Sequence, residues 1–218
     1  MIGGVDEAGR GPCIGPLVVA GLTVENDSEF IKMQVRDSKK LSPQRREILA
    51  QKIKEQAHRY EYLIVPAADI DDLRKTMTLN ELEVHLFSKI IEKLKPPICY
   101  VDSADVNEQR FGRDILANLS YTPTLISKHR ADERYPVVSA ASILAKTIRD
   151  AEVRKIAEVL EKKLGIPMGS GYPADPVTKK FLTTWYETYR EFPPFVRKSW
   201  QTIADIIMHT NMKKLDEY

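Results

Sequence analysis

Acidic residues stand where two short apolar stretches end. Asp6 and Glu7 follow a stretch that begins at Ile2, and Asp102 ends the stretch at 98–102. A charge at such a place costs free energy unless it is hydrated, paired or bound to a cation. In α/β sheets, the carboxyl ends of parallel strands line the usual ligand crevice. These three acids are therefore candidate ligands of a bound cation.

A fourth acid, Asp132, comes four residues before Pro136, where a long helix is expected to begin. It joins the same crevice if that helix packs beside the sheet. Two carboxylates about 4 Å apart repel by roughly 4 kcal/mol at an effective dielectric near 20, so a cluster retains protons or binds a cation. Oxygen ligands without His or Cys favour Mg²⁺ or Mn²⁺. Two such ions roughly 4 Å apart can orient a water and stabilise the leaving oxygen of a phosphodiester.

The pattern also has a plainer interpretation. A single Asp at a strand end is more often a cap or an ion-pair partner than a metal ligand. Adjacent residues on a strand face opposite sides, so Asp6 and Glu7 share a site only if the strand ends or twists there. Gly9 is consistent with such an ending. Spacing alone predicts no more than a candidate metal site.

A glycine-containing loop follows these first acids directly, with Gly9, Arg10 and Gly11 in succession. Glycines let backbone amides approach a ligand closely. The planar guanidinium of Arg10 suits a phosphate group. A lone Gly-x-Gly is equally typical of a tight connection between strands.

Five stretches are predicted to be strands, and helices separate the later ones. The strands are expected at 2–6, 17–22, 60–65, 98–102 and 122–127, and the helices at 42–59, 80–94, 107–119 and from 136 onward. This order predicts an α/β fold with a mixed five-stranded sheet, antiparallel first and parallel later, flanked by helices. After residue 165 no further strand is expected, and 175–210 is predicted to be helical with an interruption at Pro193-Pro194. We therefore expect a soft boundary near residue 165, with an α/β domain at 1–165 and a helical C-terminal region at 166–218, which the resemblance described below implies to be a catalytic domain and a substrate-binding region.

Composition narrows the class of protein. The 218 residues are 43% hydrophobic, which is enough for a substantial core, and 33 basic residues nearly balance 31 acidic ones. No apolar run reaches the roughly 20 residues that a membrane helix needs, and no signal peptide is visible. Cys13 and Cys99 are too few for a disulfide framework. We expect a cytoplasmic, monomeric protein with no membrane association.

Several motifs in order resemble those of one enzyme family, ribonuclease HII, in its archaeal type. The motifs are Asp6-Glu7-Ala8-Gly9-Arg10-Gly11-Pro12, Asp37-Ser38-Lys39-Lys40-Leu41, Tyr100-Val101-Asp102, Lys128 to Asp132 followed by Ser139 to Lys146, Gly169-Ser170-Gly171-Tyr172-Pro173, and Phe192-Pro193-Pro194 with Arg197-Lys198-Ser199-Trp200. The sister family, ribonuclease HIII, has a variant glycine loop and a substantial N-terminal domain. It is disfavoured, because Arg10 is present in this loop and only five residues precede Asp6.

The resemblance implies a ribonuclease H-like fold and a metal-dependent endonuclease. Its substrates would be RNA–DNA hybrids and duplex DNA that contains single ribonucleotides, cut 5′ of the ribonucleotide to leave a 3′-hydroxyl and a 5′-phosphate. Asp6, Glu7, Asp102 and Asp132 would be the catalytic acids that hold two divalent ions, Mg²⁺ or Mn²⁺. The 2′-hydroxyl would be read by Gly9, Arg10 and Gly11. Tyr172 would stack beside the following deoxyribose.

Binding of a duplex is expected to be mostly electrostatic. Lys39 and Lys146 are candidate phosphate contacts, and so are Lys179, Lys180, Arg197 and Lys198. Ser139, Ser142, Lys146 and Asp150 form a polar stripe along the predicted long helix, for which a solvated face is the default interpretation.

Two other functions compete with this one. A non-catalytic nucleic-acid-binding module of the same fold would lack a full acidic set, whereas all four acids are present. A nuclease or phosphatase for DNA or small phosphate esters would have no use for a loop that reads a 2′-hydroxyl. A sliding-clamp partner is not supported by a clear motif, because Gln201-Thr202-Ile203-Ala204 lacks a large aliphatic residue at its end.

Overall fold

The structure is a computed structural model that describes residues 1–35 and 41–215. The chain divides into two compact units, and both are discontinuous in sequence. The first unit contains Met1–Ala8, Val18–Ile64 and Met77–Ile148, and the second contains Gly9–Leu17, Val65–Thr76 and Arg149–Tyr218. The domain boundary expected at residue 165 stays a prediction.

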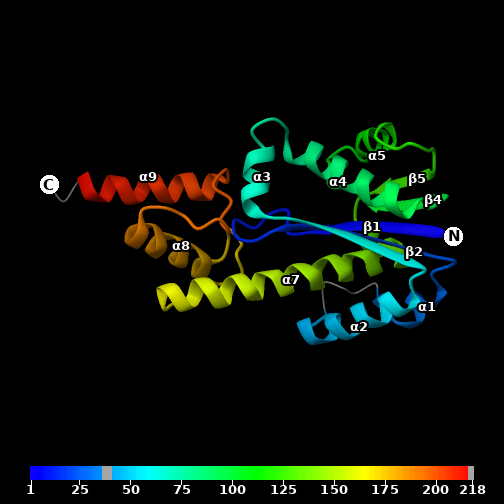
Figure 1. Cartoon of the computed structure of the whole chain (residues 1–218), viewed down its shortest axis with the longest axis horizontal. Coiled ribbons are helices and arrows are strands. Elements are labelled where there is room, and N and C mark those ends of the chain that lie inside the picture. The colour runs from blue at the N-terminus through cyan, green and yellow to red at the C-terminus, as the bar shows by residue number, and fades with distance from the viewer. Residues whose placement is uncertain (36–40, 216–218) are drawn as a thin grey trace. The chain divides into compact units, whose positions relative to one another are not determined.

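The strands and helices follow the expected order (Figure 1). The strands are β1 (Ile2–Ala8), β2 (Leu17–Val24), β3 (Arg59–Val65), β4 (Ile98–Asp102) and β5 (Thr124–Lys128). The helices are α1 (Ser28–Lys32), α2 (Pro43–Gln56), α3 (Ala67–Leu73), α4 (Leu79–Leu94), α5 (Glu108–Ala117), α6 (Ala131–Arg134), α7 (Pro136–Leu164), α8 (Pro176–Tyr189) and α9 (Gln201–Leu215).

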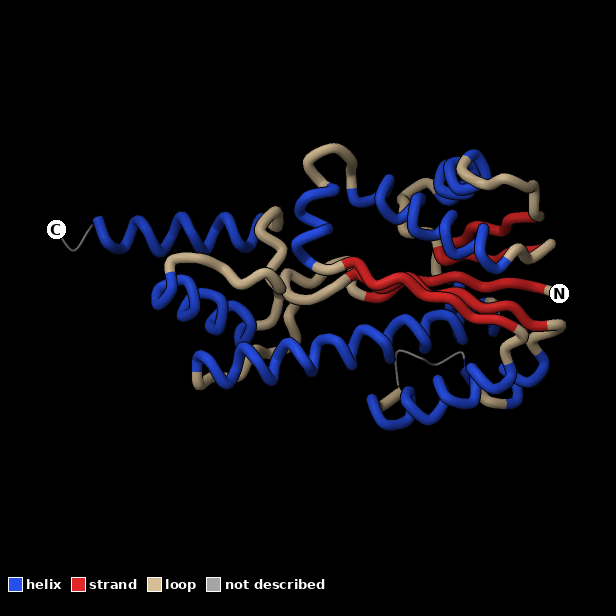
Figure 2. The backbone as a smooth tube through the Cα atoms, viewed as in Figure 1, coloured by secondary structure: helices blue, strands red, loops and turns tan. Residues whose placement is uncertain are grey.

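The five strands form one mixed sheet in the order β3-β2-β1-β4-β5 (Figure 2). β1 is antiparallel to β2 and parallel to β4, and β4 is parallel to β5. This confirms the predicted α/β class and the change from antiparallel to parallel pairing. Parallel neighbours need a crossover, and α4 and α5 lie in the connections that lead to β4 and β5.

Glycines in the first two strands let helices approach the sheet closely. A Cβ on Gly4 would lie 2.4 Å from the carbonyl oxygen of Val137 in α7, and one on Gly21 would lie 2.5 Å from Ile90 in α4. Within this unit α4 and α5 therefore cover one face of the sheet, while α1, α2 and the first part of α7 cover the other (Figure 1).

The second unit has a core of its own. The loop residues Cys13 and Ile14 are fully buried there, together with side chains from the last part of α7, α8 and α9. An isolated bridge joins Ile14 to Val196, so the loop after β1 is tied to the segment that precedes α9. The interruption expected at Pro193-Pro194 is confirmed, since α8 ends at Tyr189 and α9 begins at Gln201.

Three short helices were not expected from the sequence: α1, α3 and α6. They span four to seven residues, too few for an apolar repeat to mark them. The helix expected at 42–59 ends at Gln56, because the next residues turn into β3 and the amide of His58 donates to the carbonyl of Thr23.

Candidate active site

The strand register places Asp6 and Asp102 side by side. Val5 of β1 pairs with Val101 of β4 in parallel, so the residue that follows each of them stands at the same level of the sheet. The side chains of parallel neighbours at one level point to the same face. The two acids predicted from separate motifs therefore come from adjacent strands.

Asp6 is buried among groups that oppose and favour its charge. Burial raises the pKa of Asp6 well above its ordinary value, and the neighbouring carboxylates of Asp102 and Glu7 raise it further. A hydrogen bond from Ser142 and the ammonium of Lys146 lower the pKa of Asp6, but they do not offset the first three effects. The site thus holds a buried carboxyl that gains from an added positive charge.

Ser142 and Lys146 lie one turn apart on α7 and act on Asp6 together. The Nζ of Lys146 donates to Oγ of Ser142 over 2.7 Å, and Ser142 in turn donates to Asp6. Both Ser139 and Ser142 are fully buried, so the solvated face expected for this stripe is wrong at these two positions. Their hydroxyls face polar partners inside the first unit.

The remaining acid is held near Asp102 by backbone contacts. Oδ1 of Asp102 accepts a hydrogen bond from the amide of Ala131 at 2.6 Å, at the start of α6. Asp132 is the next residue and is almost completely buried. The hydroxyl of Ser139 donates to the backbone carbonyl of Asp132, which fixes α6 against α7.

Glu7 differs from the expectation that the strand ends near the acids. β1 continues through Ala8, so Asp6 and Glu7 both lie within the strand, Asp6 buried and Glu7 half-buried. The amide of Glu7 donates to Oδ1 of Asp6 over 2.7 Å. Among the described residues, no three Asp, Glu, His or Cys side chains converge closely enough to enclose one metal ion. The acids are neighbours, but their carboxylates are not closed around a single point.

The glycine loop belongs to the second unit. Gly9 has a φ of 93°, and a Cβ there would lie 2.5 Å from the carbonyl oxygen of Pro16, so only glycine fits. Gly11 is different, since a Cβ there would meet only the ring of Tyr172, at 3.8 Å. The structure therefore brings the loop and Tyr172 together, as their predicted shared role requires.

A network of hydrogen bonds holds the Tyr172 loop. The amide and the hydroxyl of Ser170 both donate to Oδ2 of Asp175 over 2.7 Å, and these bonds help to lower the pKa of Asp175 to about 2. The amide of Cys13 donates to the carbonyl of Gly171 over 2.9 Å, so the two loops are also joined by backbone. Tyr172 itself is 42% exposed, which leaves its ring accessible to a ligand.

Arg149 lies beside the glycine loop and Tyr172, and it was not singled out from the sequence. Its guanidinium lies 5.5 Å from the centre of the Tyr172 ring, and a Cβ on Gly9 would come within 2.6 Å of its Nε. It is only 6% exposed, and Nε and Nη2 have no hydrogen-bond partner within the part of the chain that the structure describes. The sequence could have pointed to Arg149 through its position three residues after Lys146 on the predicted helix.

Arg197 does not lie where a phosphate contact was expected. It is fully buried, and its guanidinium donates to the carbonyls of Gly9, Arg10 and Gly15 over 2.6–3.0 Å. Those bonds hold the glycine loop from within, so the prediction of a phosphate contact at Arg197 is wrong. Lys39, another predicted contact, lies outside the described residues.

Comparison with known proteins identifies the family. The family model described as Ribonuclease HII matches residues 3–203 of the chain. The chain belongs to the ribonuclease HII family. It is 48% identical to Ribonuclease HII of Methanosarcina barkeri over 216 residues, which cover 94% of this chain and 95% of that protein.

Solved structures agree with this assignment. The ribonuclease H2 of Pyrococcus horikoshii OT3 superposes with a TM-score of 0.88 at 42% identity and covers 96% of this chain and 98% of its own. A ribonuclease HII of Archaeoglobus fulgidus, solved in a complex with PCNA, gives a TM-score of 0.86 at 40% identity, with 94% and 96% covered. The ribonuclease H-like fold is thereby confirmed.

Family membership decides between the functions left open by the sequence. As a ribonuclease HII, the chain is a metal-dependent endoribonuclease that acts on RNA in RNA–DNA hybrids. It is neither a non-catalytic module nor a nuclease for DNA alone. In the described part of the chain, no helix is long and apolar enough to cross a membrane.

The raised pKa of Asp6 predicts how stability depends on pH. A raised pKa means that the folded protein holds this proton more tightly than the unfolded chain, so stability falls as pH rises from the ordinary Asp value through the raised one. Asp6→Asn removes the carboxyl group whose ionisation destabilises the folded protein. We expect the metal-free variant to melt a few degrees above the wild type at pH 7, since about 1 kcal/mol corresponds to about 2–4 °C in a chain of this size.

The difference in melting temperature should shrink as the pH is lowered toward 4. The measurement is thermal unfolding in the presence of a chelator, at several pH values, with Asp114→Asn as the control because Asp114 is an exposed acid on α5. An Asp6→Asn protein that melts no higher than the wild type at pH 7 would show that the Asp6 charge costs the fold nothing.

Proposed function

We propose that this ribonuclease HII also cleaves duplex DNA at a single embedded ribonucleotide. It would cut on the 5′ side of the ribonucleotide and leave a 3′-hydroxyl and a 5′-phosphate. The observation that carries the proposal is the pair Asp6 and Asp102 on adjacent strands, Asp6 buried and Asp102 half-buried. Burial and then the repulsion from Asp102 raise the pKa of Asp6. Two neighbouring carboxylates can bind divalent cations, and such cations can coordinate the phosphodiester of a substrate.

Two divalent ions, Mg²⁺ or Mn²⁺, would be held by Asp6, Glu7, Asp102 and Asp132. The donor set fits hard cations in type, because it contains only carboxylate oxygens. When bound, such ions activate a water and stabilise the departing 3′-oxygen. The position of Asp6 and Asp102 on adjacent strands supports this assignment.

Neighbouring side chains would keep the acids in place during the reaction. Ser142 holds one oxygen of Asp6, and Lys146 lends positive charge to the pair. The amide of Ala131 holds Asp102 through Oδ1. These contacts orient the carboxylates before a cation arrives, which lowers the entropy lost on binding.

Recognition of the ribose would fall to the glycine loop and Tyr172. The 2′-hydroxyl is what distinguishes RNA from DNA, and it can both donate and accept a hydrogen bond. Backbone groups of Gly9, Arg10 and Gly11 can reach it, because the space beside Gly11 is open apart from Tyr172. The exposed ring of Tyr172, with Arg149 behind it, offers an apolar face to the following deoxyribose.

The duplex itself would be held through its phosphates. Lys39 and Lys146 are the proposed contacts, and Lys146 can serve both a phosphate and Asp6 because an ammonium has three donors. PCNA is a second candidate partner, since the Archaeoglobus fulgidus relative forms a complex with it. Monomeric behaviour and a cytoplasmic setting stay predictions.

Two labelled duplexes test the proposed substrate. One is entirely DNA, and the other contains one ribonucleotide; both are incubated with the protein and Mg²⁺, then with Mn²⁺. We expect cleavage of the second duplex alone, at the 5′ side of the ribonucleotide, because the all-DNA duplex offers no 2′-hydroxyl to the glycine loop. An RNA–DNA hybrid is run beside them as a positive control, and cleavage of this hybrid but not of the single-ribonucleotide duplex would limit the enzyme to hybrids.

Replacing one acid separates catalysis from binding. Asp102→Asn keeps the shape of the side chain but removes one charge from the proposed cation site. We expect the cleavage rate to fall by about 10³-fold or more, as for the loss of an essential electrostatic contact, while the dissociation constant for a hybrid changes less than about threefold. Single-turnover cleavage and a binding titration measure the two quantities, with Asp114→Asn as the control. Normal turnover by Asp102→Asn would remove Asp102 from the site.

A further inference from the structure

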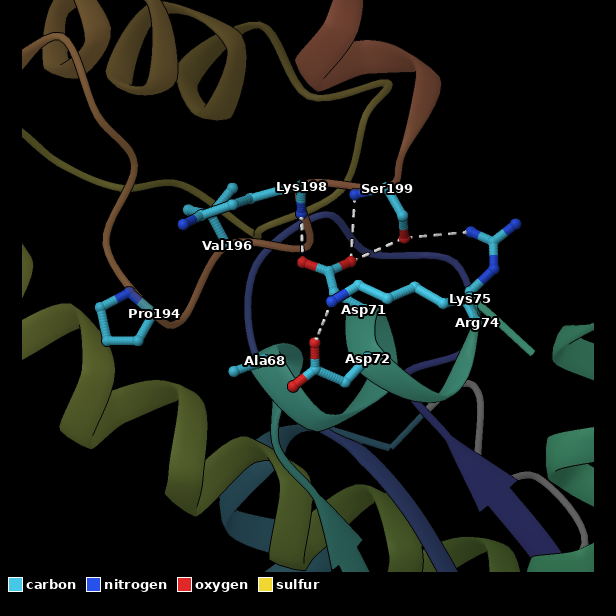
Figure 3. Close-up of a pocket in the computed structure, with 9 residues that line it drawn as sticks. All are labelled: Ala68, Asp71, Asp72, Arg74, Lys75, Pro194, Val196, Lys198 and Ser199. Carbon is cyan, nitrogen blue, oxygen red and sulfur yellow. Dashed lines mark hydrogen bonds and ion pairs between the residues drawn. The ribbon is translucent and has the colours of Figure 1, made fainter. Parts of the chain in front are cut away.

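In the second unit, hydrogen bonds from the backbone of Lys198 and Ser199 to Asp71 join α3 to the segment before α9. We call this set of bonds the clasp. Figure 3 shows its centre, where Asp71 of α3 points at the backbone of Lys198 and Ser199. Oδ2 of Asp71 accepts from the Lys198 amide over 2.7 Å, and Oδ1 accepts from the Ser199 amide over 3.0 Å and from its hydroxyl over 2.6 Å. One carboxylate thus satisfies three donors from a segment 127 residues away.

The clasped segment is the same one that holds the glycine loop. Arg197, just before Lys198, donates from within the core to the carbonyls of Gly9 and Arg10. Trp200, just after Ser199, donates from its indole Nε1 to the carbonyl of Gly11 over 3.2 Å. The two residues that Asp71 binds therefore lie between the two residues that fix the loop.

The residue that follows α3, Arg74, also contacts this segment. Nη1 of Arg74 donates to the hydroxyl of Ser199 over 3.3 Å, and the Arg74 guanidinium lies 4.9 Å from the centre of the Trp200 ring. Arg197 faces the same ring at 4.8 Å. Two guanidinium groups therefore lie within 5 Å of the centre of the Trp200 ring, while its indole nitrogen contacts the loop.

None of these three bonds joins Asp71 to another residue of α3. All three of them cross to a distant segment, and hydrogen bonds to an ionised carboxylate are roughly twice as strong as neutral ones. A cavity of about 510 Å³ lies beside the clasp, with Ala68 and Lys75 of the α3 side and Pro194 among the residues that line it. Asp71 is therefore one of the groups that attach α3 to the segment across the edge of this cavity.

We propose that Asp71 is a positioning residue for ribose recognition. It fixes the backbone at 198–199, and through Arg197 and Trp200 it sets where the carbonyls of the glycine loop lie. The inference rests on the proposed function, because it assumes that the loop reads a 2′-hydroxyl. A displacement of about 1 Å at a reacting group can cost up to about 100-fold in rate, so loss of the clasp affects cleavage even though Asp71 touches no substrate.

Adjacent aspartates give a matched pair of variants. Asp71→Ala removes the clasp, whereas Asp72→Ala removes only an ion pair with Lys75, in which both side chains are more than 70% exposed. Single-turnover rates are measured at saturating enzyme, well below the melting temperature, on a duplex with one ribonucleotide and on a long RNA–DNA hybrid. Dissociation constants for both duplexes and melting temperatures are measured in parallel.

We expect Asp71→Ala to cleave the single-ribonucleotide duplex about 10-fold more slowly or worse, within the range for a misplaced group, with its dissociation constant changed less than about twofold. The loss on the long hybrid should be smaller, since a hybrid offers a 2′-hydroxyl at every position of the RNA strand. Asp72→Ala should match the wild type on both. Ser199→Ala, which removes one of the three bonds, should lie between them, and it serves with Asp71→Asn if Asp71→Ala does not fold.

The outcomes separate this inference from the proposed function. A wild type that cleaves the single-ribonucleotide duplex while Asp71→Ala and Asp71→Asn do so equally well overturns the role of Asp71 alone. Equal losses on both substrates, in proportion to the unfolded fraction, also overturn it, because that is the effect of a purely structural contact. A wild type that cleaves only the hybrid overturns the proposed function instead.

Discussion

Repulsion between carboxylates on adjacent parallel strands is the constraint around which the first unit is arranged. The register of β1 and β4 puts Asp6 beside Asp102, and burial makes the charge of Asp6 more costly than it would be in water. Gly4 has no side chain, so α7 comes close enough to the sheet for Ser142 and Lys146 to act on Asp6. These two groups offset the charge only in part, so the pKa of Asp6 stays raised and an added positive charge would stabilise its ionised form.

In the second unit, the constraint concerns backbone groups, because the carbonyls of the glycine loop are held in place by other residues. The carbonyls of Gly9 and Arg10 in this loop accept hydrogen bonds from the buried guanidinium of Arg197, and the carbonyl of Gly11 accepts one from Trp200. Asp71 holds that support in turn. Under the proposed function, selectivity for ribose depends on the positions of groups that are distant from the loop in sequence.

Much of the fold could be predicted because continuous apolar runs mark strands buried on both faces, and the long stripe in α7 marks a helix. The acids were found from their place after such runs and from the family motifs. The burial of Ser142 could not be predicted, since a polar stripe on a helix is usually solvated. The roles of Arg197 and Asp71 could not be predicted either, because their partners lie about 130 to 190 residues away in sequence and only the tertiary fold brings them together.

Thermal unfolding with and without Mg²⁺ tests most directly whether a cation relieves the buried charge. A ligand that binds only the folded state raises the melting temperature by mass action. The account predicts that millimolar Mg²⁺ raises the melting temperature of the wild type at pH 7 and leaves that of Asp6→Asn nearly unchanged. Equal shifts in the two proteins, or no shift in the wild type even with a ribonucleotide-containing duplex bound, would contradict it.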